Sequence, residues 1–148
     1  MRPSSPTPRF HHSLSQDLAM PAVAKLFLAI GAIAMLAAVG LGAFGAHALK
    51  TRIAAELLAV YHTGVEYHFY HALGLLAVGV AALRMPESKY LRASGWLMIS
   101  GILLFSGSLY ALALTGIRAL GAITPFGGVA FLLAWALFAI AVLKAPRS

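Results

Sequence analysis

The chain has 148 residues, enough for one domain, but its composition is far from that of a soluble protein. Apolar residues make up 61% and charged residues 10%, whereas soluble domains have about 25% charged residues. This excludes an ordinary cytosolic globule and a disordered chain, and the absence of cysteine excludes disulfide scaffolds and cysteine-based metal sites. The net charge of +7 is dispersed between apolar runs, so we expect a lipid bilayer as the partner and no nucleic acid.

Residues 1–19 form a segment with three prolines, four serines and little apolar content, which predicts a disordered tail. Met20 then opens a segment in which one basic residue, Lys25, precedes a long apolar run. Met20 therefore resembles a natural beginning, and we interpret the first 19 residues as a tail or as an artefact of an upstream start site. Residues 20–148 are predicted to form a single four-helix transmembrane domain.

Four apolar runs follow in chain order, at about 26–46, 64–83, 93–114 and 125–143. The first has 21 uncharged residues, which as a helix would cross the ~30 Å hydrocarbon core. A cleaved signal peptide is the alternative for this run, but the apolar part of a signal peptide is only ~7–15 residues long. Residues 47–66 carry charges opposite an apolar stripe, which predicts an amphipathic interfacial segment before the second span.

These runs and their short loops predict an all-α membrane protein with four transmembrane helices in an antiparallel bundle. A polar turn with a proline separates the second and third spans, and Thr124-Pro125 predicts an N-cap at the start of the fourth. Eight basic residues lie on the side of the termini and three on the other side. By the positive-inside rule we expect both termini of a multi-pass protein to be cytoplasmic, in a bacterial inner membrane.

The second run differs from the others because it begins with a polar cluster, Tyr61–His71. A carboxylate inside a membrane is costly, so we expect Glu66 to accept a hydrogen bond from His47, a neighbouring tyrosine or a serine of the third run. Snorkelling to water and protonation are the alternatives. The cluster as a whole is interpreted as an interfacial belt with structural hydrogen bonds, as a proton or ligand site, or as a metal or haem site.

Catalytic patterns are missing from the sequence. It contains four carboxylates, one of them in the tail, and neither a phosphate-binding loop nor an HExxH pattern. The serines of the third run have no base nearby in sequence. We therefore expect no enzyme activity, no cofactor and no metal.

Several segments together resemble one known family. They read LGAFGAH from Leu41, TGxEY from Thr63 with His71, LFSGSLY from Leu104, TPFGG from Thr124, and WA at Trp135. In this order and spacing the chain resembles the YgdD-like family of small membrane proteins, catalogued as domain of unknown function 423, which includes eukaryotic transmembrane protein 256. The resemblance covers about residues 26–143 and implies a four-helix inner-membrane protein without supplying a function.

The same resemblance marks the candidate site residues, and it does not include His62 or His68 as ligands. The candidate polar or ligand cluster is His47, Thr63, Glu66, Tyr67 and His71. The candidate packing and polar motif is Ser106, Ser108, Tyr110, Thr124 and Pro125. As function we expect an uncharacterised, non-enzymatic accessory or structural membrane component. The alternative is a small transporter or channel-like protein with a proton- or ligand-binding cluster around Glu66. A homo-oligomer or a membrane-protein partner is compatible with either.

Overall fold

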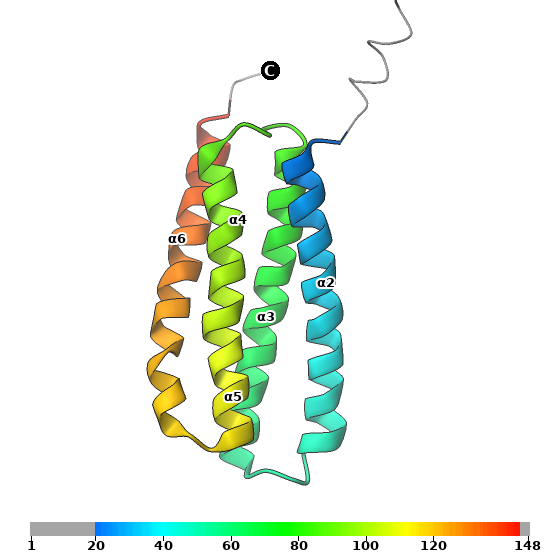
Figure 1. Cartoon of the computed structure of the whole chain (residues 1–148), viewed down its shortest axis with the longest axis vertical. Helices are drawn as coiled ribbons and strands as arrows, with labels where there is room; N and C mark the ends of the chain where they lie inside the picture. Colours follow the sequence, from blue (N-terminus) through cyan, green and yellow to red (C-terminus); the bar gives the residue numbers. More distant parts are fainter. Residues whose placement is uncertain (1–19, 146–148) are drawn as a thin grey trace, which may run out of the picture.

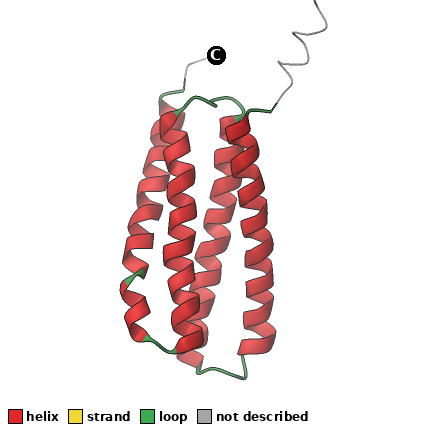
Figure 2. Ribbon diagram, in the orientation of Figure 1, coloured by secondary structure: helices red, strands yellow, loops and turns green. Residues whose placement is uncertain are grey.

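A computed structural model describes residues 20–145, and the predicted tail lies outside them. Within this range all regular secondary structure is helical (Figure 2). The long α-helices are α2 (Ala22–Phe44), α3 (Ala55–Ala82), α4 (Lys89–Gly101), α5 (Gly107–Thr115) and α6 (Thr124–Leu143). Two π-helical turns, η1 (Gly45–Leu49) and η2 (Ile102–Ser106), continue α2 and join α4 to α5, and a 3-10 turn, η3 (Arg118–Ala122), precedes α6.

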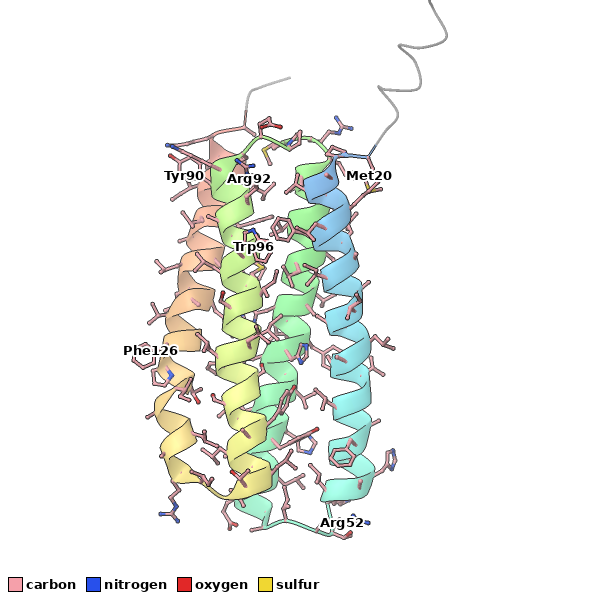
Figure 3. The ribbon with its side chains drawn as sticks, viewed as in Figure 1. Met20, Arg52, Tyr90, Arg92, Trp96 and Phe126 are labelled. Carbon is pink, nitrogen blue, oxygen red and sulfur yellow. The ribbon has the colours of Figure 1, made fainter. Side chains whose placement is uncertain are left out.

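The helices form four rods that lie side by side, with their connections at alternating ends (Figure 1). One end holds both limits of the described chain and the α3–α4 loop, and we call it the terminus end. The opposite end, where Arg52 lies, is called the Arg52 end (Figure 3). α2 packs mainly on α3, and α4 packs mainly on α6. α3 also contacts α4, η2 and α5, so it lies between α2 and the third rod.

Three of the four rods are long and apolar enough to cross a membrane: Ala22–Leu49, Lys89–Thr115 and Arg118–Leu143. They contain the predicted first, third and fourth spans and extend each of them by several residues. α3, which contains the predicted second span, has 28 residues but does not meet the same criterion of composition. The cause is its polar first part, since Glu56, Glu66 and three histidines precede an apolar second part.

The predicted amphipathic segment 47–66 is not one element, which corrects that expectation. The chain turns at 50–54, where Arg52 N–H donates to the Leu49 carbonyl at 2.8 Å. Ala54 is extended and forms the N-cap of α3, so the second half of the segment is the beginning of α3 itself. The consecutive polar residues at 50–52 favour a solvated turn over the continuous helix that the apolar spacing suggested.

The start of α6 also differs from the expectation. Pro125 lies in its first turn as predicted, but Thr124 is helical and its side chain does not cap the helix. The Thr124 hydroxyl instead forms a 2.8 Å hydrogen bond with the Ser108 hydroxyl, which ties α6 to α5. The preceding turn depends on Gly116, whose φ of 72° is left-handed and ends α5 at little steric cost.

Two apolar clusters fill the interior. The larger one extends from the terminus end past the middle and includes Phe27, Leu75, Met98 and Phe131. The smaller one lies towards the Arg52 end and consists of Leu49, Tyr61, Val65 and Ala113. Close helix packing supports both clusters, because a β-carbon added at Gly95 would collide with the Phe27 ring of the larger cluster, and one at Gly45 would collide with the Tyr61 ring of the smaller cluster.

Candidate functional site

The polar cluster of α3 divides between two faces of the helix. Tyr61, His68 and His71 are buried, whereas Glu66 and Tyr70 are exposed. An interfacial belt would extend its polar tips towards water, and the three buried side chains do not do so. The sequence therefore placed polar residues on this helix correctly, but it did not indicate which of them point inward.

The predicted cluster around Glu66 does not assemble in the structure. His47 lies exposed on η1, and Thr63 is exposed, its hydroxyl donating to the Ala59 carbonyl at 3.1 Å. Glu66 is exposed, and neither a hydrogen bond nor a salt bridge involves its carboxylate within residues 20–145. The expectation that Glu66 forms a structural hydrogen bond inside the bundle is therefore wrong. Its side chain lies on the outward face of α3, since the inward positions are filled by buried residues.

Tyr67 and His71 are the two members of the predicted cluster that come together. Their rings lie 6.0 Å apart and nearly parallel, because residues four positions apart share one side of a helix. His71 also stacks on Phe131 of α6, with ring centroids 3.3 Å apart and an interplanar angle of 11°. Tyr67 stacks on Phe105 of η2 at 4.4 Å. Three rods thus contribute rings to one aromatic cluster.

This aromatic cluster borders a groove of about 440 Å³ between α3, η2 and α6. Its lining contains Tyr67, His71, Phe105, Pro125, Gly128, Val129, Phe131, Leu132 and Trp135. Leu132 is 74% exposed and Val129 is 54% exposed, so the groove opens at the surface of the bundle. Tyr67, His71 and Pro125 were candidates from the sequence, whereas no site role was expected for Phe105, Phe131 or Trp135. The spacing of Phe131 and Trp135, four residues apart on one apolar helix, is the signal that could have linked them.

The hydrogen bond of His71 determines which of its nitrogens is free. Nδ1 lies 2.7 Å from the Tyr67 carbonyl oxygen, which can only accept, so Nδ1 carries the proton. In a neutral ring the acceptor lone pair then lies on Nε2. Nε2 has no hydrogen-bond partner within residues 20–145. In this range Ser106 Oγ is the only side-chain oxygen or nitrogen that is both fully buried and without a partner. His71 Nε2 must therefore be partly accessible from outside the protein.

The remaining buried polar groups connect helices. Tyr61 donates its hydroxyl to the Leu41 carbonyl at 2.9 Å, which links α3 to α2. His68 Nδ1 lies 3.2 Å from the Tyr110 hydroxyl and links α3 to α5. Ser94 donates to the Ala134 carbonyl at 2.8 Å and links α4 to α6. His68 therefore connects two helices, and the roles of Tyr61 and Ser94 were not anticipated.

The residues of the candidate packing and polar motif do not form one site, and their contacts differ. Ser108 joins Thr124, Tyr110 joins His68, and Pro125 lines the groove. Ser106 is fully buried and lacks a hydrogen-bond partner. Among the described residues, no three His, Asp or Glu side chains gather in an arrangement that could hold a metal ion.

Comparison with known proteins gives one family. The family model described as "Protein of unknown function (DUF423)" matches residues 41–128. The UPF0382 membrane protein YwdK of Bacillus subtilis is 53% identical over 120 residues, which cover 81% of this chain and 98% of the relative. A UPF0382 membrane protein of Staphylococcus saprophyticus is 47% identical, with the same coverage of both chains. No solved structure gives a significant match.

Proposed function

This chain belongs to the DUF423 family of membrane proteins, and on that premise we propose that it is a non-enzymatic accessory component of a larger membrane assembly, with four transmembrane helices. The observation that carries the proposal is Glu66, a charged residue that faces outward from the middle part of α3 and has no partner within the described bundle. A second membrane protein would supply that partner.

α3, which contains the predicted second span, completes the set of four spans in this proposal. Its 28 residues correspond to about 42 Å, as long as the neighbouring rods and longer than the ~30 Å hydrocarbon core. α2 ends at the Arg52 end and α4 begins at the terminus end, so the chain between them covers the same distance as its neighbours (Figure 1). These connections support the proposed antiparallel arrangement of four spans.

The basic residues support an orientation with both termini in the cytoplasm of a bacterial cell. The beginning of α2, the α3–α4 loop with the start of α4, and the end of α6 lie at the terminus end (Figure 1), and these segments carry Lys25, Arg84, Lys89, Arg92 and Lys144. The turn at 50–54 and η3 lie at the Arg52 end, and they carry Lys50, Arg52 and Arg118. By the positive-inside rule the terminus end is cytoplasmic. A C-terminal alkaline phosphatase fusion should be inactive and a C-terminal fluorescent protein bright. The opposite pair of results would overturn the orientation.

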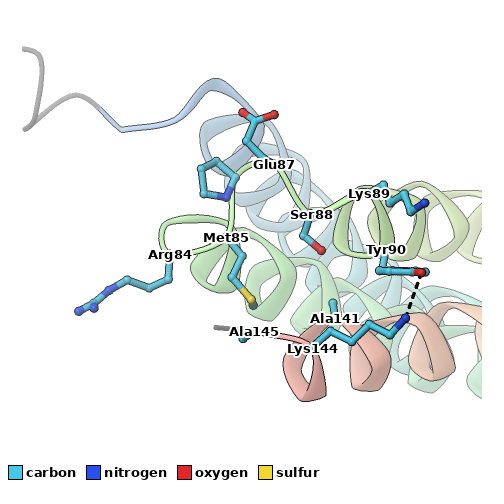
Figure 4. A pocket seen from close by; sticks show the side chains of 10 residues that line it. Arg84, Met85, Glu87, Ser88, Lys89, Tyr90, Ala141, Lys144 and Ala145 are labelled. Atoms are coloured by element: carbon cyan, nitrogen blue, oxygen red, sulfur yellow. Dashed lines mark hydrogen bonds between the residues drawn. The ribbon is translucent and has the colours of Figure 1, made fainter. Parts of the chain in front are cut away.

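The terminus end also offers a hollow suited to the lipid surface. It measures about 530 Å³ and is lined by the α3–α4 loop, the start of α4 and the end of α6 (Figure 4). Lys144 donates to the Tyr90 hydroxyl at 3.3 Å, and its Nζ lies 4.8 Å from the centre of the Tyr90 ring. Lys89 Nζ lies 5.5 Å from the same centre. Two ammonium groups around one aromatic ring suit the anionic surface of the cytoplasmic leaflet.

The depth of Glu66 explains why a partner is needed. It is the twelfth residue of α3, about 16 Å from the beginning of the helix. If the hydrocarbon core is centred on α3, Glu66 lies about 10 Å inside it. An ionised carboxylate near this depth costs up to about 2.5–3.5 kcal/mol on insertion scales. Thr63 and Tyr70 lie on the same exposed stripe and add hydroxyl groups to the surface that a partner would cover.

We expect the partner to be a different protein. A symmetric dimer through this face would bring the Glu66 residues of both copies towards each other, and like charges in a low-dielectric interface repel. A transmembrane helix with a lysine, arginine or histidine, or with a hydroxyl or amide donor, has the complementary chemistry. This choice agrees with an accessory role in an assembly and differs from a self-sufficient channel.

Photo-crosslinking in native membranes tests the proposal. A photoreactive residue at Tyr70, which is 57% exposed on the α3 face, should give one discrete adduct with another protein. The same residue at Leu36, which is 74% exposed on α2, is the matched control and should give only lipid adducts. Glu66→Leu should remove the Tyr70 adduct without unfolding the chain. A product of exactly dimeric mass, or lipid adducts alone at both positions, would refute the proposed partner.

The alternative function is a small transporter or channel-like protein. It is favoured by the groove that Tyr67 and His71 share, because two groups capable of hydrogen bonding border an accessible hollow. A transport path would also need His47 and Glu66 near that groove, and both lie exposed elsewhere. Proteoliposomes that show proton flux sensitive to Glu66→Gln would favour transport over the accessory role.

A further inference from the structure

The groove between α3 and α6 has the features of a small-molecule site, and its chemistry is independent of the Glu66 face. Its volume of about 440 Å³ lies within the range of ligand pockets, ~300–1,000 Å³. Its walls combine aromatic rings with a small number of polar groups, as ligand sites do. Because it opens among exposed apolar side chains of α6, a ligand would enter from the lipid and not from water.

His71 is the polar group that selects the ligand. The residue is only 5% exposed, and Nε2 is an acceptor that no group within residues 20–145 satisfies. A molecule that binds there gains most if it donates a hydrogen bond to Nε2. Tyr67 adds a hydroxyl group, which also forms no hydrogen bond within that range.

The rings around Nε2 select the rest of the ligand. Tyr67, Phe105, Phe131 and Trp135 offer faces and edges on which a flat ring can stack. Val129 and Leu132 continue the groove towards the lipid as an apolar surface suited to an aliphatic tail. Gly128 adds no side chain to the groove wall, and a β-carbon there would meet Phe105 at an ordinary contact distance of 3.8 Å, so a larger residue fits at this position without a clash at its β-carbon.

We propose that this groove binds a lipid-soluble ring that carries a hydroxyl group, of the phenol or hydroquinone class. The ring stacks among the aromatic side chains and its O–H donates to His71 Nε2. The hydrocarbon substituent lies along the apolar surface of α6. Binding involves no covalent or redox step.

The probe for the test is 2-bromo-4-decylphenol, compared with its methyl ether, which has the same ring and tail but no O–H. The full chain with Trp96→Phe is reconstituted in phosphatidylcholine nanodiscs, so that Trp135 is its only tryptophan. Bromine quenches tryptophan on contact, so binding in the groove appears as saturable quenching. A Trp135→Phe chain, which retains only Trp96, should show non-saturable quenching from probe dissolved in the lipid.

We expect the phenol to bind about fivefold more tightly than its methyl ether, the value of one neutral hydrogen bond. His71→Leu should remove this difference, whereas His62→Leu, outside the groove, should retain it. Gly128→Leu should fill the groove and abolish saturation, and Gly40→Leu is its matched control, since nothing lies within 4 Å of that position. Equal binding of phenol and ether or non-saturable quenching of Trp135 would overturn the proposal. So would a phenol preference retained in His71→Leu, or unchanged saturation in Gly128→Leu.

Discussion

The two ends of the bundle are held together by different interactions. Towards the terminus end, the larger cluster consists mainly of packed aliphatic and aromatic side chains such as Phe27, Leu75 and Val78, and one buried hydrogen bond, from Ser94 to the Ala134 carbonyl, accompanies it. Towards the Arg52 end, the smaller cluster contains Tyr61, and hydrogen bonds of Tyr61, His68 and Ser108 join neighbouring helices. Both kinds of interaction can hold helices together in a membrane, because close packing and interhelical hydrogen bonds take the place of the hydrophobic effect there.

The difference between the two ends indicates which part of the bundle can carry functional side chains. A helix that relies on packing alone can have an entirely apolar surface, as α3 does after His71. The polar part of α3, from Tyr61 to His71, differs from that apolar part. Inward-facing Tyr61 and His68 form hydrogen bonds to other helices, whereas the outward-facing Glu66 carboxylate and the Nε2 of buried His71 have no partner within residues 20–145. The polar half is therefore the part from which both proposals above arise.

The largest effect is expected in the packed half. Phe27 is fully buried, and its ring lies against Gly95 and edge-on to Trp96. Phe27→Ala should lower the free energy of unfolding by about 3 kcal/mol, because neighbouring helices cannot collapse into the space. Unfolding in a denaturing detergent measures this loss. Leu36→Ala, at an exposed position of the same helix, is the control, and an equal loss there would contradict the comparison.

The next largest effect is expected where the backbones of α6 and η2 approach each other closely. Gly127→Ala would place a methyl group against the Phe105 backbone, which cannot move aside without shifting η2. We expect a loss of about 1–3 kcal/mol from overpacking. Gly40→Ala, where the added carbon meets nothing within 4 Å, should be neutral or slightly stabilising. Thermal melting in detergent distinguishes the two, and identical melting temperatures would show that η2 yields without cost.

A smaller effect is expected from the hydrogen bonds of the polar half. Tyr61→Phe removes the hydroxyl that donates to the Leu41 carbonyl but retains the buried ring. Interhelical hydrogen bonds in membranes average about 0.6 kcal/mol, so we expect a loss of that order. The same denaturation assay applies, with Tyr70→Phe as the exposed control. A loss as large as that of Phe27→Ala would mean that the polar half depends on this single bond.

The smallest effect is expected at Glu66. Because its side chain is exposed and unpaired within the described bundle, Glu66→Gln should leave the unfolding free energy of the purified chain unchanged within about 0.5 kcal/mol. A clear destabilisation in detergent would show that the carboxylate has a partner inside the bundle. Loss of the Tyr70 adduct with unchanged stability would assign Glu66 to an interface.

Much of the fold followed from local patterns. The apolar runs predicted the helices because length and composition alone determine whether a segment can span, and Pro125 marked the first turn of α6 because proline is compatible with that position. The candidate site was less predictable from the sequence than the helices were. Helical spacing showed that Tyr67 and His71 share a side, but the direction of that side depends on α6, which is more than 50 residues further along the chain. For the same reason, spacing could not show that Glu66 faces outward.

The π-helical turn η2 has a consequence for the third rod as a whole. One residue more per turn than the α-helix rotates everything after it by about 100° relative to an uninterrupted helix. With this offset the rod keeps the same two neighbours on both sides of η2. α4 packs mainly on α6 and also contacts α3, and α5 directs Tyr110 to His68 of α3 and Ser108 to Thr124 of α6. In this segment the number of residues therefore matters as much as their identity. Deletion of one residue between Ile102 and Ser106 would leave the rod equally hydrophobic. It would rotate α5 about the helix axis, so that Tyr110 and Ser108 no longer face His68 and Thr124.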